Sequence, residues 1–275
     1  MSNWQDGYVE GNGIKIHYYR TGDGDKPPVV LAHGFSDDGL CWTPVAKALE
    51  ADYDVIMVDA RGHGLSEAPE SGYDSLTQAG DLRAVIEALE LYRPAVIGHS
   101  MGAATTLVLA GTYPEVPGAI VLEDPPAWWM PGSAGGFDPN WQVRMREWIR
   151  SLKSKTREQL IEECRQQNPS WPEEELGPWA DSKLRLSEKV LNRADPPQID
   201  WEKTARAVRC PALLVTGDND KGAIVSPEQA EALRSLVPHL EVVHVPGTGH
   251  NIRREGFEPF ISAVRGFLQR WAESR

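Results

Sequence analysis

Short apolar runs alternate with longer amphipathic segments along the first half of the chain. The apolar, β-branched runs predict strands, and the segments with helical spacing predict core-facing helices. Alternation of this kind favours βαβ units around a buried parallel sheet. The predicted strands are residues 14–19, 28–32, 53–58, 94–98 and 118–122, and the predicted helices are residues 42–51, 75–91 and 101–110.

The pattern changes after Pro126. Residues 127–203 have no strand-like runs, carry more charge, and contain helical segments that prolines interrupt. We therefore predict that residues 127–203 form an inserted helical cap. Seven of the ten tryptophans lie in or at the edge of this segment: Trp128, Trp129, Trp141, Trp148, Trp171, Trp179 and Trp201.

Strand-like runs return after the proposed cap, at residues 210–216 and 240–245. An amphipathic segment at 257–271 predicts a terminal helix. The predicted core therefore consists of residues 1–126 and 204–275, and its class is α/β.

Composition and charge exclude several classes of protein. The chain has 275 residues, 41% of them hydrophobic and 25% charged, which is typical of a globular protein. The formal net charge of −12 disfavours binding to nucleic acid or to anionic lipid. We find neither an apolar run long enough to span a membrane nor a signal sequence. The three cysteines lack metal-site spacing, so we expect reduced thiols and a cytoplasmic protein.

Gly98-His-Ser-Met-Gly102 matches the G-x-S-x-G pattern of a nucleophile at a sharp strand-to-helix turn. A predicted buried strand precedes the motif and a helix of small residues follows it, as the pattern requires. The start of that helix directs free N–H groups toward a developing oxyanion. Ser100 is the candidate nucleophile.

A serine nucleophile needs a base, and the base needs a third group that fixes its tautomer. His250 follows the last predicted strand in a glycine-rich loop and is the candidate base. For the acid we prefer Asp220, three residues beyond Gly217. The alternatives are Asp218 in the same loop, and the pair Glu123 and Asp124 just past residues 118–122.

Two backbone N–H groups should hold the oxyanion. The first is that of Met101, directly after the nucleophile, and the second is that of Phe35, in the loop after the strand at 28–32. The glycine-rich loop at 59–66 lacks the lysine of a phosphate-binding loop, so we interpret it as structural.

The tryptophans of the proposed cap suit the wall of an apolar cavity. We predict that Phe35, Trp128 and Trp129 bind substrate. The other interpretation of the tryptophans is that they form the small core of the cap itself. Asp37 and Asp38 either orient a polar substrate group or are solvated, and we favour solvation because acidic residues are mostly exposed.

Taken together, these motifs resemble those of α/β-hydrolase fold proteins over essentially the whole chain. The resemblance implies an eight-stranded, mostly parallel sheet with a cap after the sixth strand. It also supports the triad of Ser100, Asp220 and His250, with Phe35 and Met101 as oxyanion donors. A serine at position 100 disfavours the branches that attack with an aspartate. The matching segments, in family order, are His33-Gly34-Phe35, Asp59-Ala-Arg-Gly-His-Gly64, Gly98-His-Ser-Met-Gly102, Gly217-Asp-Asn-Asp220 and Gly249-His250.

The chain departs from the family pattern after Asp220, where Lys221-Gly-Ala replaces a short proline-containing turn. This departure leaves the choice between Asp220 and Asp218 open.

We expect a serine hydrolase that cleaves a small hydrophobic ester or lactone through an acyl-enzyme. Such a reaction requires no metal and no organic cofactor. The alternatives are a carbon–carbon bond hydrolase, a lyase or a perhydrolase with the same triad, or a small-molecule receptor of this fold. The sequence leaves the oligomeric state open, a homodimer included.

Overall fold

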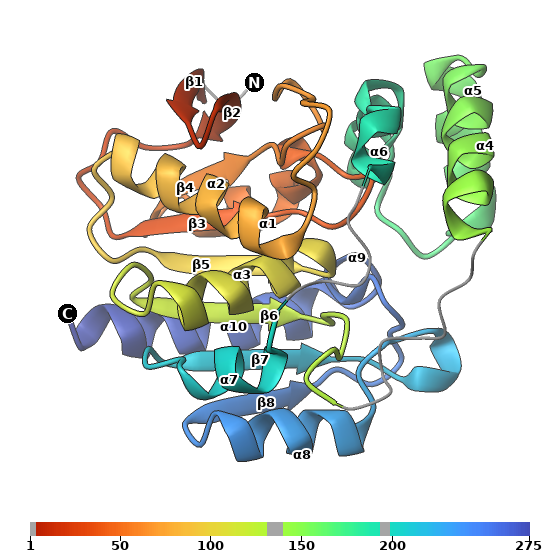
Figure 1. The fold of residues 1–275 in the computed structure, drawn as a ribbon. Helices are drawn as coiled ribbons and strands as arrows, with labels where there is room; N and C mark the ends of the chain where they lie inside the picture. The colour runs from red at the N-terminus through yellow and green to blue at the C-terminus, as the bar shows by residue number, and fades with distance from the viewer. Residues whose placement is uncertain (1–3, 131–139, 193–198) are drawn as a thin grey trace.

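The computed structural model describes residues 4–130, 140–192 and 199–275. An eight-stranded sheet with the order β1-β2-β4-β3-β5-β6-β7-β8 runs through the molecule (Figure 1). The first two strands pair antiparallel, β2 is antiparallel to β4, and the remaining neighbours are parallel. The strands are β1 (Gln5–Gly11), β2 (Ile14–Arg20), β3 (Pro28–Ala32), β4 (Asp54–Val58), β5 (Ala95–His99), β6 (Ala119–Glu123), β7 (Ala212–Thr216) and β8 (Leu240–His244).

The sheet confirms the predicted eight-stranded, mostly parallel α/β fold, and only β1 was absent from the sequence pattern. This strand lies at the edge of the sheet, and most of its residues are exposed or half-buried. A strand with so little buried surface leaves no apolar alternation to detect.

Helices cover both faces of the sheet, as Figure 1 shows. Residues of β3 alternate between the two layers: Val30 packs on one side, and Val29 and Leu31 pack on the other. One side holds α2 (Ser75–Ala88), α3 (Met101–Thr112), α7 (Trp201–Arg206) and α8 (Pro227–Leu236), and the other holds α1 (Thr43–Leu49), α9 (Ile252–Glu255) and α10 (Phe257–Glu273).

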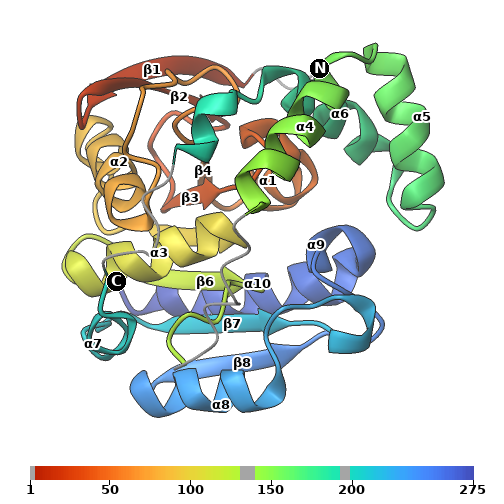
Figure 2. The same cartoon turned by 45° about the vertical axis from the view of Figure 1, so that its right-hand side comes forward.

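Between β6 and α7, the described residues form three helices and a short 3-10 turn. They are α4 (Trp141–Lys153), α5 (Arg157–Gln167), α6 (Glu173–Arg185) and η2 (Glu188–Leu191). Helices α4 to α6 gather at the end of the molecule toward which the parallel strands point (Figure 2). There α6 packs against η1 (Gly39–Trp42) and α1.

The helix α7 packs against α3 and α8 and therefore belongs to the layered core. The predicted boundary between residues 203 and 204 falls inside this helix. Trp201, which we grouped with the cap tryptophans, lies at the start of α7 and is buried in the core.

The three cysteines are buried and form no disulfide. Burial raises the pKa of the Cys210 thiol to about 12, so this group stays protonated and unreactive near neutral pH. Across the described ranges, no helix combines the length and the apolar character needed to cross a membrane.

Candidate active site

Ser100 occupies a sharp turn between β5 and α3. Its backbone has φ 50° and ψ −113°, a conformation that costs free energy for a residue with a Cβ atom. The turn is possible because glycines stand on either side. A Cβ atom on Gly102 would lie 2.1 Å from the carbonyl oxygen of Ala32, and one on Gly98 would lie 2.4 Å from that of Gly102. The motif therefore builds the elbow that the sequence predicts.

The elbow places Ser100 at the N-terminus of α3, where the first backbone N–H groups have no partner within the helix. The backbone N–H of Ser100 itself donates to the carbonyl of Glu123, 2.9 Å away. This bond continues the parallel pairing of His99 with Glu123 across β5 and β6. The residue that follows each of these strands therefore lies at the same edge of the sheet.

Asp124 is the residue that follows β6, and it contacts His250. Its Oδ2 lies 2.6 Å from Nδ1 of His250. The carboxylate is fully buried and also accepts hydrogen bonds from the backbone N–H groups of Ile224 and Val225. A carboxylate held in this way fixes the tautomer of the imidazole with its proton on Nδ1, which leaves Nε2 as the basic nitrogen.

The structure does not bring the predicted acid, Asp220, to His250, and this prediction is wrong in its geometry. Asp220 is exposed in a short turn, η3 (Asn219–Lys221). Asp218 instead accepts hydrogen bonds from Nε2 of His244 (2.9 Å) and from the backbone N–H of Gly247 (2.7 Å). The carboxylate that contacts Nδ1 of His250 is therefore that of Asp124, which follows β6 and was one of the alternatives.

His99 links the candidate base to the strand that carries the candidate nucleophile. Its Nε2 donates to the backbone carbonyl of His250 over 3.0 Å, and the two rings are 4.7 Å apart. Burial, with added repulsion from the charge of Arg253, holds the pKa of His99 well below its usual value. His99 is therefore neutral and adds no charge beside His250.

Ser100, Met101 and Phe35 line one cavity of about 210 Å³. This places the candidate nucleophile and both candidate oxyanion donors at the same space. The volume exceeds that of an engineered apolar cavity that takes up benzene, about 150 Å³. Its wall is mostly apolar and aromatic and is completed by His63, Tyr73, Ser75, Gln78, Pro126, Trp128, Trp141, Met145 and Val190.

Of the two tryptophans predicted to bind substrate, Trp128 lies on the cavity wall and Trp129 does not. The ring of Trp128 packs against that of Trp201, 4.9 Å away. Trp129 is 5% exposed within the hydrophobic core, and its indole N–H donates to the carbonyl of Gln229. The prediction for Trp129 is therefore wrong, because this side chain turns into the layer of helices instead of the cavity.

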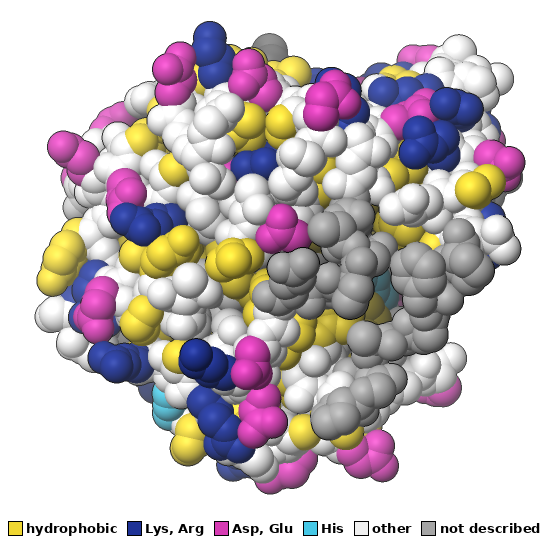
Figure 3. Space-filling model, viewed as in Figure 1, with side chains coloured by type: hydrophobic (Ala, Val, Ile, Leu, Met, Phe, Trp, Pro, Cys, Tyr) yellow, Lys and Arg dark blue, Asp and Glu magenta, His cyan; other side chains and the backbone are white. Residues whose placement is uncertain are grey.

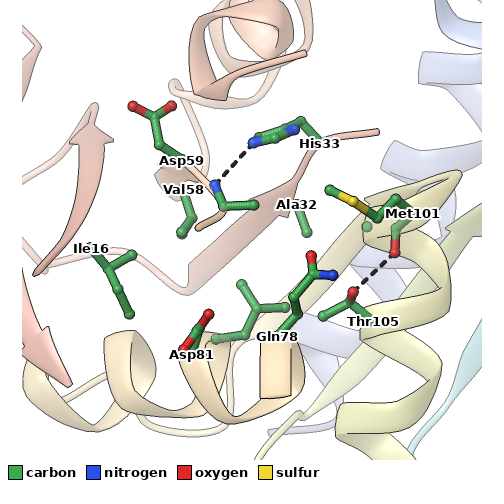
Figure 4. Close-up of a pocket in the computed structure, with 12 residues that line it drawn as sticks. Ile16, Ala32, His33, Val58, Asp59, Gln78, Asp81, Met101 and Thr105 are labelled. Carbon is green, nitrogen blue, oxygen red and sulfur yellow. Dashed lines mark hydrogen bonds between the residues drawn. The ribbon is translucent and has the colours of Figure 1, made fainter. Parts of the chain in front are cut away.

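A second, smaller cavity lies between the sheet and helices α2 and α3 (Figure 4). Gln78 and Met101 line both cavities. The smaller one has a volume of about 20 Å³, which is room for a single water molecule. It is too small for a substrate, and the 210 Å³ cavity is the candidate binding site because Ser100 lines it.

Asp37 and Asp38, which we expected to be solvated, are both buried. Burial alone would raise the pKa of Asp37, but Arg254, Lys183 and Arg253 hold that pKa well below its usual value. For Asp38, burial and the neighbouring charge of Asp59 raise the pKa to about 7. The exposure expected of acidic residues is overridden for Asp37 because Lys183, Arg253 and Arg254 pair with its carboxylate, whereas Asp38 has an ion pair with Arg185.

The glycine-rich loop after β4, which we interpreted as structural, begins at a buried carboxylate. The buried carboxylate of Asp59 accepts hydrogen bonds from the backbone N–H groups of Gly39 (2.7 Å) and Leu65 (2.8 Å). It also lies 2.9 Å from Nδ1 of His17 on β2. Within the described ranges, no group of three or more His, Cys, Asp or Glu side chains is arranged to hold a metal ion.

The fold and the site together define a class of protein. The sequence pattern of the alpha/beta hydrolase fold family matches residues 27–256, and the chain belongs to this family. Its relatives include hydrolases that align along almost their whole length.

Three relatives illustrate the range of the family around this chain. N-formylmaleamate deformylase of Pseudomonas putida is 29% identical over 265 residues, which cover 95% of this chain and 96% of that protein. 2-(Acetamidomethylene)succinate hydrolase of Mesorhizobium japonicum is 26% identical over 264 residues, 89% of each protein. The crystal structure of N-formylmaleamic acid deformylase from Pseudomonas putida S16 superposes with a TM-score of 0.78 at 26% identity and covers 94% of this chain and 100% of that chain.

Proposed function

We propose that this protein is a serine hydrolase that cleaves a carboxylic ester or lactone through an acyl-enzyme intermediate. The observation that carries the proposal is the 2.6 Å contact between Asp124 and His250, at the sheet edge where Ser100 occupies a strained strand-to-helix turn and donates its backbone N–H to the carbonyl of Glu123. A buried carboxylate that orients an imidazole beside a serine is the arrangement that activates a hydroxyl nucleophile.

In the proposed mechanism, Ser100 Oγ attacks the carbonyl carbon while Nε2 of His250 accepts the hydroxyl proton. The carboxylate of Asp124 stabilises the imidazolium through its contact with Nδ1. The backbone N–H groups of Phe35 and Met101 hold the tetrahedral oxyanion. When this intermediate collapses, the carbon–oxygen bond to the leaving alcohol breaks and His250 returns its proton to that alcohol. A water molecule, deprotonated by His250, then releases the acid and restores Ser100.

The cavity supports a small, uncharged and largely hydrophobic substrate. No Lys, Arg, Asp or Glu side chain lines it among the residues that the structure describes. His63 on its wall is neutral as well, because burial lowers the pKa of its imidazole to about 3. Phe35 and Trp128 offer ring surfaces for an apolar group. On the face of the molecule shown in Figure 3, hydrophobic side chains are exposed across the middle of the view, with charged side chains among and around them.

A second candidate is hydrolysis of an acyl–nitrogen bond by the same residues. The names of the two curated relatives, a deformylase of a maleamate and a hydrolase of an acetamidomethylene succinate, favour it. Attack, oxyanion stabilisation and proton return would be unchanged, and His250 would protonate a leaving nitrogen in place of an oxygen. The two candidates differ only in the group that leaves.

The test compares turnover of p-nitrophenyl acetate, butyrate and octanoate with turnover of matched p-nitroanilides. Ser100→Ala should abolish turnover, whereas Ser235→Ala, a matched change at an exposed position on α8, should leave it intact. Preferred cleavage of the anilides would select the second candidate. Turnover that survives in Ser100→Ala would refute both. A single stoichiometric acylation of wild type, without turnover, would favour a receptor of this fold.

A further inference from the structure

The loop that carries Phe35 is held in place from outside the sheet. Its next residue, Ser36, has φ 68°, a left-handed conformation that disfavours any residue with a Cβ atom. One internal hydrogen bond closes the turn, from the backbone N–H of Asp37 to the carbonyl of Gly34. A strained turn persists only where surrounding contacts hold it.

Lys183, on helix α6 of the inserted segment, supplies such contacts. Its ammonium group donates to the backbone carbonyl of Ser36 over 2.8 Å and to the carboxylate of Asp37 over 3.0 Å. A third bond goes to the hydroxyl of Ser182, at 3.3 Å. Lys183 is only 2% exposed, so all three of its protons are used within the protein.

Asp37 connects the same loop to the rest of the candidate site. Its second carboxylate oxygen lies 3.2 Å from Arg253 and 3.1 Å from Arg254. Arg253 in turn donates to Glu123, the residue before Asp124, through both its backbone N–H and its side chain. One buried carboxylate therefore ties the Phe35 loop to the loops that carry the candidate acid and base.

We propose that Lys183 is a positioning residue for the oxyanion hole, and that helix α6 completes the active site through it. The bond to the carbonyl of Ser36 fixes the peptide group between Ser36 and Asp37, which lies two peptide groups beyond the one that carries the Phe35 N–H donor. A lost or displaced donor weakens binding of the tetrahedral intermediate more than binding of the ground state. This inference rests on the proposed function, because it concerns the oxyanion of that reaction.

The experiment replaces Lys183 by Met, which keeps most of the volume and removes all donors. The matched control is Lys47→Met, which removes a half-exposed ion pair between α1 and Glu174 of the same helix α6. Lys183→Gln retains an NH₂ group with two N–H donors and serves as the conservative variant. The readouts are kcat and KM for p-nitrophenyl butyrate, inhibition by 1,1,1-trifluoro-3-phenylpropan-2-one, whose adduct with serine is tetrahedral, and the melting temperature.

We expect Lys183→Met to lower kcat by roughly 10- to 100-fold, somewhat less than the loss of a whole oxyanion donor. KM should stay within about threefold of the wild-type value. The affinity for the inhibitor should fall by the same factor as kcat/KM, because both quantities report on stabilisation of the tetrahedral state. Lys183→Gln should recover part of kcat, and Lys47→Met should match wild type.

The proposal is overturned if Lys183→Met keeps wild-type kcat and inhibitor affinity, or if only its KM changes. It is also overturned if kcat falls as much in Lys47→Met as in Lys183→Met. If neither variant at position 183 folds, the lysine serves stability, and the positioning role is refuted. A failure of the proposed function looks different: wild type would not turn over esters or anilides, or Ser100→Ala would remain active. That result would remove both proposals.

Discussion

Replacing Asp124 by Asn tests whether the acid that orients His250 is Asp124, as the 2.6 Å contact indicates, or Asp220, as the sequence suggested. Each carboxylate oxygen of Asp124 accepts a backbone N–H: Oδ1 that of Val225 at 2.9 Å, and Oδ2 that of Ile224 at 2.8 Å. Oδ1 also accepts a second bond from Ile224, at 3.1 Å. An asparagine has only one acceptor oxygen, and the backbone donors will hold it at the Oδ1 position. Its NH₂ group must then face Nδ1 of His250.

An NH₂ group facing Nδ1 forces the imidazole into the other tautomer, with its proton on Nε2. That nitrogen can no longer accept a proton from Ser100, so the base is lost although the shape of the site is kept. In serine proteases the equivalent change lowers kcat by about 10⁴-fold, and we expect a loss of the same order here. This corresponds to about 5 kcal/mol of transition-state stabilisation.

The assay is steady-state hydrolysis of p-nitrophenyl butyrate by Asp124→Asn, with Asp220→Asn as the matched control. Because Asp220 is exposed and the contact with Nδ1 of His250 is made by Asp124, the control should retain kcat within about twofold. The melting temperature of each variant separates a chemical effect from unfolding. A large loss in Asp220→Asn, or equal small losses in both variants, would refute the assignment of Asp124.

Three further predictions concern stability and substrate binding. Gly102→Ala should destabilise the fold by about 1–3 kcal/mol or more, because its Cβ atom would meet the backbone carbonyl of Ala32 at 2.1 Å; denaturant unfolding measures this. Trp129→Phe should lower the free energy of unfolding by about 1–3 kcal/mol, because it removes a buried hydrogen bond, and should leave KM unchanged. Trp128→Ala should raise KM, because Trp128 lines the cavity. The free energy of unfolding of the Asp38→Asn variant, measured with urea, should increase relative to that of wild type as pH rises from 4 to 8, by up to about 4 kcal/mol.

The sign of the last prediction follows from proton binding. In the folded state burial raises the pKa of Asp38 to about 7, against 3.8 for an ordinary aspartate. Between these values the folded state binds more protons than the unfolded state, so wild type loses stability as pH rises through this window. The asparagine has no proton to lose. A constant difference between the two proteins from pH 4 to 8 would contradict this reasoning.

The other two predictions have their own controls. Gly266→Ala, also within a helix, would bring its Cβ atom no closer than 3.7 Å to Arg270, so it separates the clash at Gly102 from the general effect of replacing a helical glycine. Equal stability losses at the two positions would contradict the steric argument. For the tryptophans, a raised KM in Trp129→Phe with Trp128→Ala unchanged would reverse our placement of the cavity wall.

The sequence by itself determined the class of fold and two members of the candidate triad. Strands and helices follow from the local spacing of apolar residues, which reports burial within one element. Ser100 was identifiable because its motif has a fixed spacing around a strained turn, and that strain demands glycines nearby. His250 was identifiable because the chain order places it after the last strand, at the edge where parallel strands end.

Only the tertiary structure decided which carboxylate meets His250. Asp124 and Asp220 both follow buried strands, and local sequence offers no way to rank them. The pairing of β6 with β5 places Asp124 beside the serine turn, whereas a short turn carries Asp220 into solvent. Trp129 and Asp37 gave the same difficulty, because each is buried by partners more than 90 residues away in sequence. Long-range contacts of this kind leave no periodic trace in the chain, so their outcome appears only when the elements pack.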